Sequence, residues 1–343
     1  MSRPVRTMEE LASLVGLSRP TVSKYFNDPG SVRAATRSRI ESAVTESGFR
    51  PNLHAVNLNR RRARLIGVVV PHALDPFYMA LVRRIEQVAT GRGYLAFVLG
   101  SDGRAELEER AVRTFASMNV AGTIVAPLGP RRRRSRLRDL KLDMPLVAID
   151  SPLDAATAFV GTDNRRSVAS MVEYLCGSGE PPAWFDMPAV NHNAAERREA
   201  YGAAMRACGH EPVHLPLEPS STWEFERYGA EQAERLIGAG GLDAGTVLCA
   251  NDRLAFGVLS AAWRRGLKVG RGEGCDLRVA GHDDHPLSAY ACPPLTTVSQ
   301  DHERIGQLAT ELLIERIGEP EPRSCAADRR VLLDATLAIR ESA

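Results

Sequence analysis

The stretch Leu11-Ala-Ser-Leu-Val-Gly-Leu-Ser-Arg-Pro-Thr-Val-Ser23 contains two short helical patterns separated by a glycine. Gly16 supplies a tight turn, and Ser18 can cap the helix that follows it. Two helices at this spacing are typical of a helix-turn-helix, whose second helix projects its N-terminal side chains into the major groove of DNA. This stretch therefore predicts a DNA-binding head at the start of the chain.

The residues on either side extend the prediction to three helices. Thr7-Met-Glu-Glu10 has the pattern of a capping box, in which Thr7 and Glu10 satisfy each other's backbone amides at a helix start. A third periodic segment runs from 35 to 46 and ends at Gly48. Apolar side chains at helical spacing are expected to face inward at Leu11, Leu14, Val15, Ile40, Ala43 and Val44.

The second helix divides its side chains between the core and DNA. Val22 and Phe26 are expected to face the core, while Arg19, Thr21 and Lys24 offer donors to base edges or phosphates. The alternative is a basic helical head with no DNA role.

Pro20 is compatible with this second helix. With Ser18 as the cap, Pro20 falls on the second helical residue, where the missing N–H would have no helical partner. Pro20 can offer only apolar contact, so it would form part of the DNA-reading surface without donating.

Charge is distributed unevenly along the chain of 343 residues. Residues 1–64 hold 12 Lys and Arg against 5 Asp and Glu, whereas the remainder holds 32 against 37. A basic head on a mildly acidic body indicates a polyanionic partner for the head alone. The basic run at 131–138 is interpreted as a solvated surface rather than as a second nucleic-acid patch.

From Leu65 onward, buried apolar strands alternate with amphipathic helices. This alternation predicts an α/β fold with doubly wound parallel sheets, and its length favours two lobes over one. Strands are expected at 65–70, 94–99, 122–126, 146–149, 246–250 and 277–280, and helices at 77–90, 164–176, 194–208, 226–237, 252–265 and 301–317.

Several classes of protein are disfavoured by what the sequence does not contain. No apolar run approaches the length of a membrane span and no signal-peptide pattern follows Met1, so a cytoplasmic location is expected. The six cysteines lack metal-site spacing, and His282 and His285 beside two aspartates fit a loop better than a metal site. The dinucleotide pattern GxGxxG begins at Gly238 but fails at Asp243, and no Walker, GxSxG or HExxH pattern occurs. We therefore predict a protein that is not an enzyme and needs no cofactor or metal.

The head also resembles a known family. Thr7-Met-Glu-Glu-Leu-Ala-x-x-Val-Gly-Leu-Ser-x-x-Thr-Val-Ser-Lys-x-x-Asn27, followed by Thr36-Arg37 and Gly48-Phe-Arg-Pro-Asn52, is similar to the DNA-binding domain of lactose-repressor (LacI/GalR) regulators. In that family the next segment, here Asn52 to Leu58, forms a hinge helix on operator DNA, and its leucine enters the minor groove. The resemblance implies DNA contacts from Thr7, Ser18, Arg19, Pro20, Thr21, Ser23, Lys24, Asn27, Arg33, Thr36, Arg37, Asn52, Ala55 and Leu58.

The resemblance continues through nearly the whole chain. Ile66-Gly-Val-Val-Val-Pro71, Gly161-Thr-Asp-Asn164, Ala250-Asn-Asp-Arg253 and Pro293-Pro-Leu-Thr-Thr297 match family landmarks in order. It implies a DNA-binding domain at 1–50, a hinge at 51–64, and a two-lobed effector domain at 65–343 similar to periplasmic sugar-binding proteins. It also implies a homodimer on a pseudo-palindromic operator, with effector contacts from Asp75, Phe77, Asp163, Asn193, Arg197, Trp223, Asn251, Asp283 and Gln300.

The predicted pocket is rich in carboxylates and amides, which favours a neutral sugar or polyol as effector. A purine or a sugar phosphate is the alternative, as is a sugar-binding receptor without a DNA role. Asp163 and Asn251 could instead cap the helices that follow them, and Asp283 and its neighbour Asp284 could order a turn. Trp223 is out of register with the family by about one residue, and Ala200 stands where the family usually has glycine.

Overall fold

The computed structural model describes residues 5–27, 29–49, 64–129, 137, 140, 144–242, 245–318 and 330–343. The chain separates into two compact units, Met1–Arg64 and Leu65–Ala343, which we call the head and the effector unit. The predicted hinge residues Asn52, Ala55 and Leu58, the side chain of Asn27, and the basic run at 131–138 apart from Leu137 lie outside the described residues.

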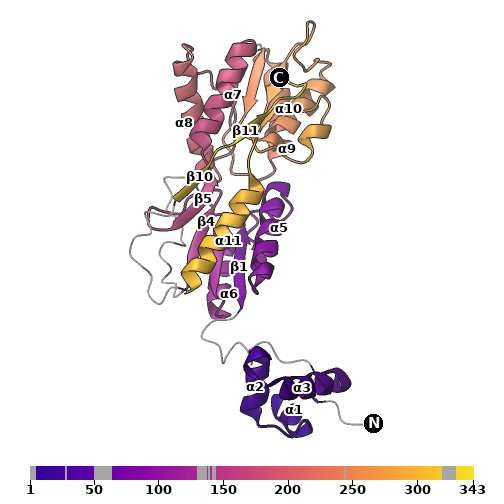
Figure 1. Cartoon of the computed structure of the whole chain (residues 1–343). Coiled ribbons are helices and arrows are strands. Elements are labelled where there is room, and N and C mark those ends of the chain that lie inside the picture. The colour runs from indigo at the N-terminus through magenta and orange to yellow at the C-terminus, as the bar shows by residue number, and fades with distance from the viewer. Residues whose placement is uncertain are drawn as a thin grey trace. The chain divides into compact units, whose positions relative to one another are not determined.

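Within its described residues, 5–27, 29–49 and 64, the head contains three short α-helices and one turn of 3-10 helix (Figure 1). The predicted capping box is present, because Glu10 N–H donates to Thr7 Oγ1 at 3.1 Å and Thr7 N–H to Glu10 Oε2 at 3.2 Å. The helices of the head are α1 (Met8–Leu14), α2 (Arg19–Asn27), η1 (Pro29–Ser31) and α3 (Ala34–Ser47).

Gly16 and Ser18 form the turn between α1 and α2. Gly16 has φ +58°, and a Cβ there would lie 3.0 Å from the guanidinium of Arg39, so both conformation and space favour glycine. The carbonyl of Ser18 accepts the N–H of Thr21 and of Val22, which begins α2 at Arg19 and places Pro20 second in the helix. The predicted helix-turn-helix is confirmed.

The core of the head matches the predicted face with one exception. Leu11, Val15, Val22 and Ile40 are buried, but Leu14 is 57% exposed, so its predicted inward position is wrong. Ala12 packs in the core instead. Helix α1 ends at Leu14, and the next residue, Val15, is the one that enters the core.

The first lobe of the effector unit is built on a six-stranded parallel sheet in the order β10-β5-β4-β3-β1-β2. Along β1, Ile66 and Val68 pack with α5 and α11 on one face, while Val69 packs with α6 on the other. The elements of this lobe are β1 (Leu65–Val70), α5 (Pro76–Gly91), β2 (Leu95–Gly100), α6 (Ala105–Ser117), β3 (Gly122–Val125), β4 (Leu146–Ile149), β5 (Ala158–Thr162), α11 (His302–Gly318) and β10 (Arg330–Leu333).

The second lobe is built on a parallel sheet, β6-β7-β8, and an antiparallel pair, β9 and β11. Helices α9 and α10 pack closely because both carry glycine at the contact, and a Cβ on Gly229 would lie 2.5 Å from the carbonyl oxygen of Leu254. The elements are α7 (Asn164–Ser178), β6 (Ala183–Phe185), α8 (His192–Ala207), α9 (Phe225–Gly238), β7 (Thr246–Cys249), α10 (Asp252–Arg264), β8 (Arg278–Ala280), η3 (Ser288–Tyr290), β9 (Thr297–Ser299) and β11 (Thr336–Ala338).

The chain crosses between the two lobes after β5, after β9 and after β10 (Figure 1). The three crossings are bonded to one another: Thr162 Oγ1 donates to Gln300 Oε1 at 2.5 Å, and Asp163 N–H donates to Leu333 O at 2.9 Å. The predicted α/β class with a helical head and a two-lobed doubly wound body is confirmed. Among the described residues, no helix combines the length and apolar character that crossing a bilayer requires.

Candidate functional site: an interlobe cavity and a DNA-reading helix

A polar cavity lies between the lobes of the effector unit, with an empty volume of about 380 Å³ including its opening to solvent. The first lobe contributes side chains from α5 and from the end of β4, and the second lobe contributes loops and the starts of α8, α9 and α10. The lining residues are Asp75, Phe77, Tyr78, Asp150, Met187, Asn191, Asn193, Arg197, Trp223, Phe225, Asn251, Arg253 and Asp283.

Arg197 is the central cation of this cavity. It is buried on α8, and its guanidinium donates to Asn164 Oδ1 at 2.8 Å and to the carbonyl of Ala250 at 2.7 Å. Its Nη2 lies 3.0 Å from Asp283 Oδ1. The same carboxylate oxygen accepts Nε2 of Gln300 at 2.8 Å. These contacts with Asn164, Ala250 and Asp283 together hold the Arg197 guanidinium in one orientation.

Burial by itself would raise the pKa of Asp283, but the Arg197 guanidinium and His282 lower it to about 2. Burial and Arg197 lower the pKa of His282 to about 4. A neutral His282 can donate from Nδ1 to Asp283 at 3.0 Å while its Nε2 faces Ser167 Oγ at 2.9 Å. Asp283 is thus a fixed anion in the floor of the cavity.

A second carboxylate, Asp150, connects the lobes. Its Oδ2 accepts the hydroxyl of Tyr78 at 3.0 Å, and its Oδ1 accepts Nδ2 of Asn193, from the second lobe, at 2.8 Å. Burial raises the pKa of Asp150 to about 6, although Arg197 opposes the rise. This carboxyl therefore changes its charge around pH 6.

Arg253 connects the lobes at the opposite wall. It binds Glu226 through Nε and Nη2, at 2.7 Å each, and its Nη1 lies 3.0 Å from Asp75 Oδ2 in the first lobe. Burial raises the pKa of Asp75, and Arg253 opposes this. The guanidinium also lies 5.0 Å over the ring of Phe225, a cation–π contact.

Aromatic rings enclose the polar groups. Trp223 packs against the cores of both lobes and lies 5.6 Å from the ring of Phe225. Phe77 contacts Tyr78 at 5.1 Å and His302 at 4.9 Å, between ring centroids. Flat apolar faces next to fixed carboxylates and amides can bind the C–H face and the hydroxyls of a small polar molecule.

The structure brings most of the predicted effector residues together. Asp75, Phe77, Asn193, Arg197, Trp223, Asn251 and Asp283 line the cavity, and the predicted residues Asp163 and Gln300 do not. Asp163 caps α7 by accepting the amides of Arg165 and Arg166, as the alternative interpretation expected. Gln300 lies behind Asp283 at a lobe crossing. Asn251 both caps α10 and lines the cavity.

Sequence reasoning missed several cavity residues, among them Tyr78, Asp150, Phe225 and Arg253. Asp150 directly follows β4, and the carboxyl ends of parallel strands are where such folds bind ligands, so its position was a usable signal. Arg253 ends the family-like segment Ala250-Asn-Asp-Arg253, but no local pattern linked it to the cavity, because its partner Asp75 is 178 residues away in the chain.

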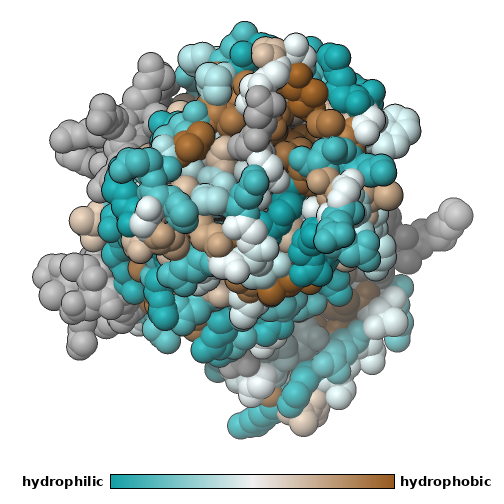
Figure 2. Space-filling model, turned by 90° about the horizontal axis from the view of Figure 1, so that it is seen from above, coloured by the Kyte–Doolittle hydropathy of each residue, from teal (hydrophilic) through white to brown (hydrophobic). Residues whose placement is uncertain are grey.

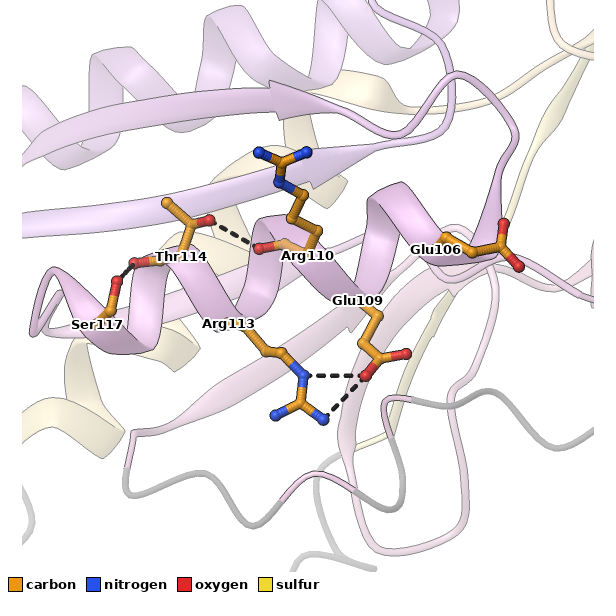
Figure 3. Close-up of a pocket in the computed structure, with 6 residues that line it drawn as sticks. All are labelled: Glu106, Glu109, Arg110, Arg113, Thr114 and Ser117. Carbon is orange, nitrogen blue, oxygen red and sulfur yellow. Dashed lines mark hydrogen bonds and ion pairs between the residues drawn. The ribbon is translucent and has the colours of Figure 1, made fainter.

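A separate hollow lies along the outer face of α6 (Figure 3). Its lining side chains come from successive turns of that one helix, and Arg113 is bonded to Glu109 at 2.9 Å. None of the predicted effector residues lies there. The cavity between the lobes remains the candidate effector site.

In the head, the predicted DNA-contacting residues of α2 lie at the surface. Ser18, Arg19, Pro20 and Lys24 are exposed, while Thr21 is half-buried. Ser18 Oγ and Thr21 Oγ1 are 2.8 Å apart. Of the other predicted contacts that the structure describes, Thr7 and Arg33 are exposed and Ser23, Thr36 and Arg37 are half-buried.

Comparisons with known families match both units. Residues 7–52 match the family described as bacterial regulatory proteins, lacI family, and residues 176–343 match the periplasmic binding protein-like domain. The chain is a lacI-family regulator. As a member of this family it is a DNA-binding regulator of transcription, with a helix-turn-helix head and a periplasmic-binding-protein-like effector unit.

Relatives of this lacI-family regulator span nearly its whole length. The ribose operon repressor of Escherichia coli strain K12 is 28% identical over 316 residues, which cover 92% of this chain and 94% of that protein. The HTH-type transcriptional repressor CytR of the same strain is 28% identical, covering 98% and 96%. The repressor PurR of Aliivibrio fischeri strain MJ11 is 28% identical, covering 92% and 93%.

Solved structures share the fold of the regulator. A Lac repressor dimer bound to operator and the anti-inducer ONPF matches with a TM-score of 0.83 at 24% identity, covering 99% of each chain. A complex of the regulator CelR with cellobiose matches with a TM-score of 0.69 at 25% identity, covering 99% of this chain and 100% of that one.

Proposed function

We propose that this regulator is a repressor of a carbohydrate uptake or catabolic operon, controlled by a neutral sugar or polyol bound in the interlobe cavity. The observation that carries the proposal is the fixed array of Asp75, Asp150, Asn193, Arg197 and Asp283, which converges on one cavity from both lobes. Carboxylates and amides can accept or donate to neighbouring hydroxyls in fixed directions, and a guanidinium can fork onto two oxygens.

The charge balance of the cavity disfavours an anionic effector. Arg197 already contacts Asp283, and Arg253 already contacts Asp75 and Glu226, so both guanidinium groups are balanced by carboxylates. A phosphate would have to approach these carboxylates or separate them from their arginines. A sugar phosphate is therefore a weaker candidate than an uncharged sugar.

A purine is the second candidate. Phe77, Trp223 and Phe225 line the cavity and could stack on a flat base, and repressors named for purine control occur among the relatives. The relatives also include a ribose operon repressor, and a structural neighbour binds cellobiose. The cavity carboxylates, which can accept the hydroxyls of a sugar, favour a sugar over a purine.

The proposed control acts through the arrangement of the lobes. Asp150 with Asn193, and Asp75 with Arg253, join opposite walls of the cavity, so a ligand that inserts between them changes which lobe arrangement is favoured. The hinge at 51–64, with Leu58 as its wedge, is the element whose order would respond on DNA.

We further propose that the chain acts as a homodimer in the cytoplasm, on pseudo-palindromic operator DNA, without catalytic activity or cofactor. Large apolar side chains are exposed in both lobes, including Phe97 at 47% and Leu95 at 57% on the edge strand β2, and Trp263 at 79% on α10. Viewed from above, the effector unit shows separate hydrophobic areas among hydrophilic residues (Figure 2). Such areas are suited to burial against a second copy.

A ligand screen tests the effector class. Sugars, polyols, sugar phosphates and purines are added in turn to the full chain, and the thermal midpoint is measured with each. The proposal expects the largest shift with an uncharged sugar or polyol, together with a changed affinity for operator DNA in a gel shift. A shift confined to sugar phosphates or purines overturns the effector class and leaves the repressor function standing.

The receptor alternative requires a different comparison. Gel shifts with the full chain and with a chain that starts at Leu65 separate a DNA-binding regulator from a sugar-binding protein without a DNA role. The repressor proposal expects only the full chain to bind.

A further inference from the structure

The base-reading helix of the head carries an ion pair to the helix before it. Arg19, the first residue of α2, places its Nε 2.5 Å from Oε1 of Glu9, in the first turn of α1. Both side chains lie at the surface, with 59% of Arg19 and 62% of Glu9 exposed. Arg19, which the sequence predicts to contact DNA, is therefore ion-paired with a carboxylate of the preceding helix.

The fold of the head has little need of this pair. Exposed ion pairs of this kind add little to stability, because both charges stay hydrated. The start of α1 is already satisfied by the capping box of Thr7 with Glu10, whose carboxylate also accepts the N–H of Arg6 at 2.7 Å. Glu9 is not part of that box, so the start of α1 does not depend on its contact with Arg19.

The major-groove edge of a G·C pair matches the two side chains. A guanidinium donates to O6 and N7 of guanine, and a carboxylate accepts the N4 amino group of cytosine. O6 and N4 lie side by side on that edge, since they are hydrogen-bonded to each other in the base pair. A contact through Nε leaves the terminal nitrogens of Arg19 as the donors for guanine.

We propose that Glu9 is a specificity-determining residue that reads one G·C pair jointly with Arg19. This inference rests on the operator binding stated above. Arg19 binds the guanine and Glu9 the cytosine of the same pair. An A·T pair presents the acceptor O4 of thymine to the Glu9 carboxylate, which repels it.

Glu9 also weakens binding to DNA that lacks this base pair. Nonspecific binding depends on cations placed against phosphates, and the carboxylate next to Arg19 offsets one of those cations and repels the phosphate itself. The Glu9 carboxylate therefore stabilises the complex with one base pair and repels the phosphate backbone of any DNA. Both effects raise the ratio of specific to nonspecific affinity.

The test measures base discrimination with the full chain. Duplexes are first selected from a randomised pool by the wild-type chain, and each G·C pair of the selected half-site is then replaced singly by A·T. Dissociation constants are measured for the wild type, Glu9→Gln, Glu9→Asp, Arg19→Gln and Glu46→Gln. Glu46→Gln removes the same charge from an exposed position in the last turn of α3 and serves as the matched control.

One position of the half-site is expected to respond. There, the loss of affinity on changing G·C to A·T should be about tenfold smaller for Glu9→Gln than for the wild type, because glutamine can donate to thymine O4. Arg19→Gln should reduce discrimination at the same position. Glu9→Gln should also bind random DNA more tightly, with a salt slope steeper by up to about 0.9. Glu9→Asp keeps the charge with a shorter reach, so it should lose the base preference and keep the weak nonspecific binding.

Three results overturn the inference. One is a Glu9→Gln chain with wild-type discrimination at every position and wild-type affinity for random DNA. Another is a Glu46→Gln chain that shows the same changes as Glu9→Gln, because the loss of one negative charge anywhere on the head would then explain them. The third is an Arg19→Gln effect at a different position from that of Glu9→Gln. A wild-type chain that selects no preferred duplex would contradict operator binding itself, whereas any of the three results above, obtained on a selected duplex, would contradict only the role of Glu9.

Discussion

Glu108 provides a quantitative test of the effector unit because it is a buried acid with a single described role. It lies on α6, is 2% exposed, and accepts the backbone N–H of Leu128 at 2.7 Å. The next residue, Gly129, donates to the carbonyl of Val190 in the second lobe at 2.8 Å. Burial raises the pKa of Glu108 from 4.5 to about 7, although the Leu128 N–H opposes the rise.

The expected magnitude follows from that pKa. One pKa unit corresponds to about 1.4 kcal/mol, so keeping Glu108 ionised in the fold costs roughly 3 kcal/mol well above pH 7. Since the folded pKa is raised, the stability associated with the protonated form is fully present below the unfolded pKa of 4.5 and is lost as the pH rises through about 7. Glu108→Gln keeps the acceptor for Leu128 and removes the charge. Its stability advantage over the wild type should therefore grow by roughly 2 kcal/mol between pH 5 and pH 8.

Guanidinium unfolding followed by tryptophan fluorescence measures this difference. Trp184, Trp223 and Trp263 all lie in the effector unit, so the signal reports that unit alone. Glu106→Gln, at an exposed position on the same helix, is the matched control and should show no growing advantage. A Glu108→Gln advantage that stays constant from pH 5 to pH 8 would contradict this prediction, because it would mean that burial does not raise the pKa of the Glu108 carboxyl.

Three further predictions concern ligand and DNA. Arg197→Ala should abolish the thermal shift caused by the effector while leaving operator affinity intact, and an unchanged ligand titration would remove Arg197 from the site. Asp150, whose pKa burial raises to about 6, should make effector affinity fall as the pH drops below 6, since a protonated carboxyl accepts hydroxyl donors less strongly; calorimetry on Asp150→Asn should show this pH dependence gone. Leu58→Gly should weaken binding to the selected operator far more than binding to random DNA in gel shifts, and equal losses would contradict the minor-groove wedge.

Much of the fold could be predicted because local sequence patterns decide it. The strands Leu65–Val70 and Leu146–Ile149 lie where the continuous apolar runs placed them. Helix α6 was not predicted, because Glu108 interrupts its apolar face with a charged residue that the fold nevertheless buries. The short strand β6 (Ala183–Phe185) was not predicted either, since three residues carry too little periodicity.

The cavity was predictable only in part, for a related physical reason. Asp75 and Asn251, which cap the helices α5 and α10, could be predicted as cavity residues because they lie in segments that resemble the family. Arg253 acts through Asp75 and Glu226, and Asp150 through Tyr78 and Asn193, and these partners meet only in the folded effector unit. Glu9 belongs to the same class, since its contact with Arg19 depends on how α1 and α2 cross.

The proposed function requires that one chain join DNA binding by the head to ligand binding by the effector unit. The most direct measurement is a gel-shift titration of the selected operator with the full chain and with the chain that starts at Leu65, each with and without the ligand that gives the largest thermal shift. The proposed function predicts binding by the full chain alone and a change in its affinity when the ligand is present. Equal binding by both chains, or an affinity of the full chain that the ligand leaves unchanged, would contradict it.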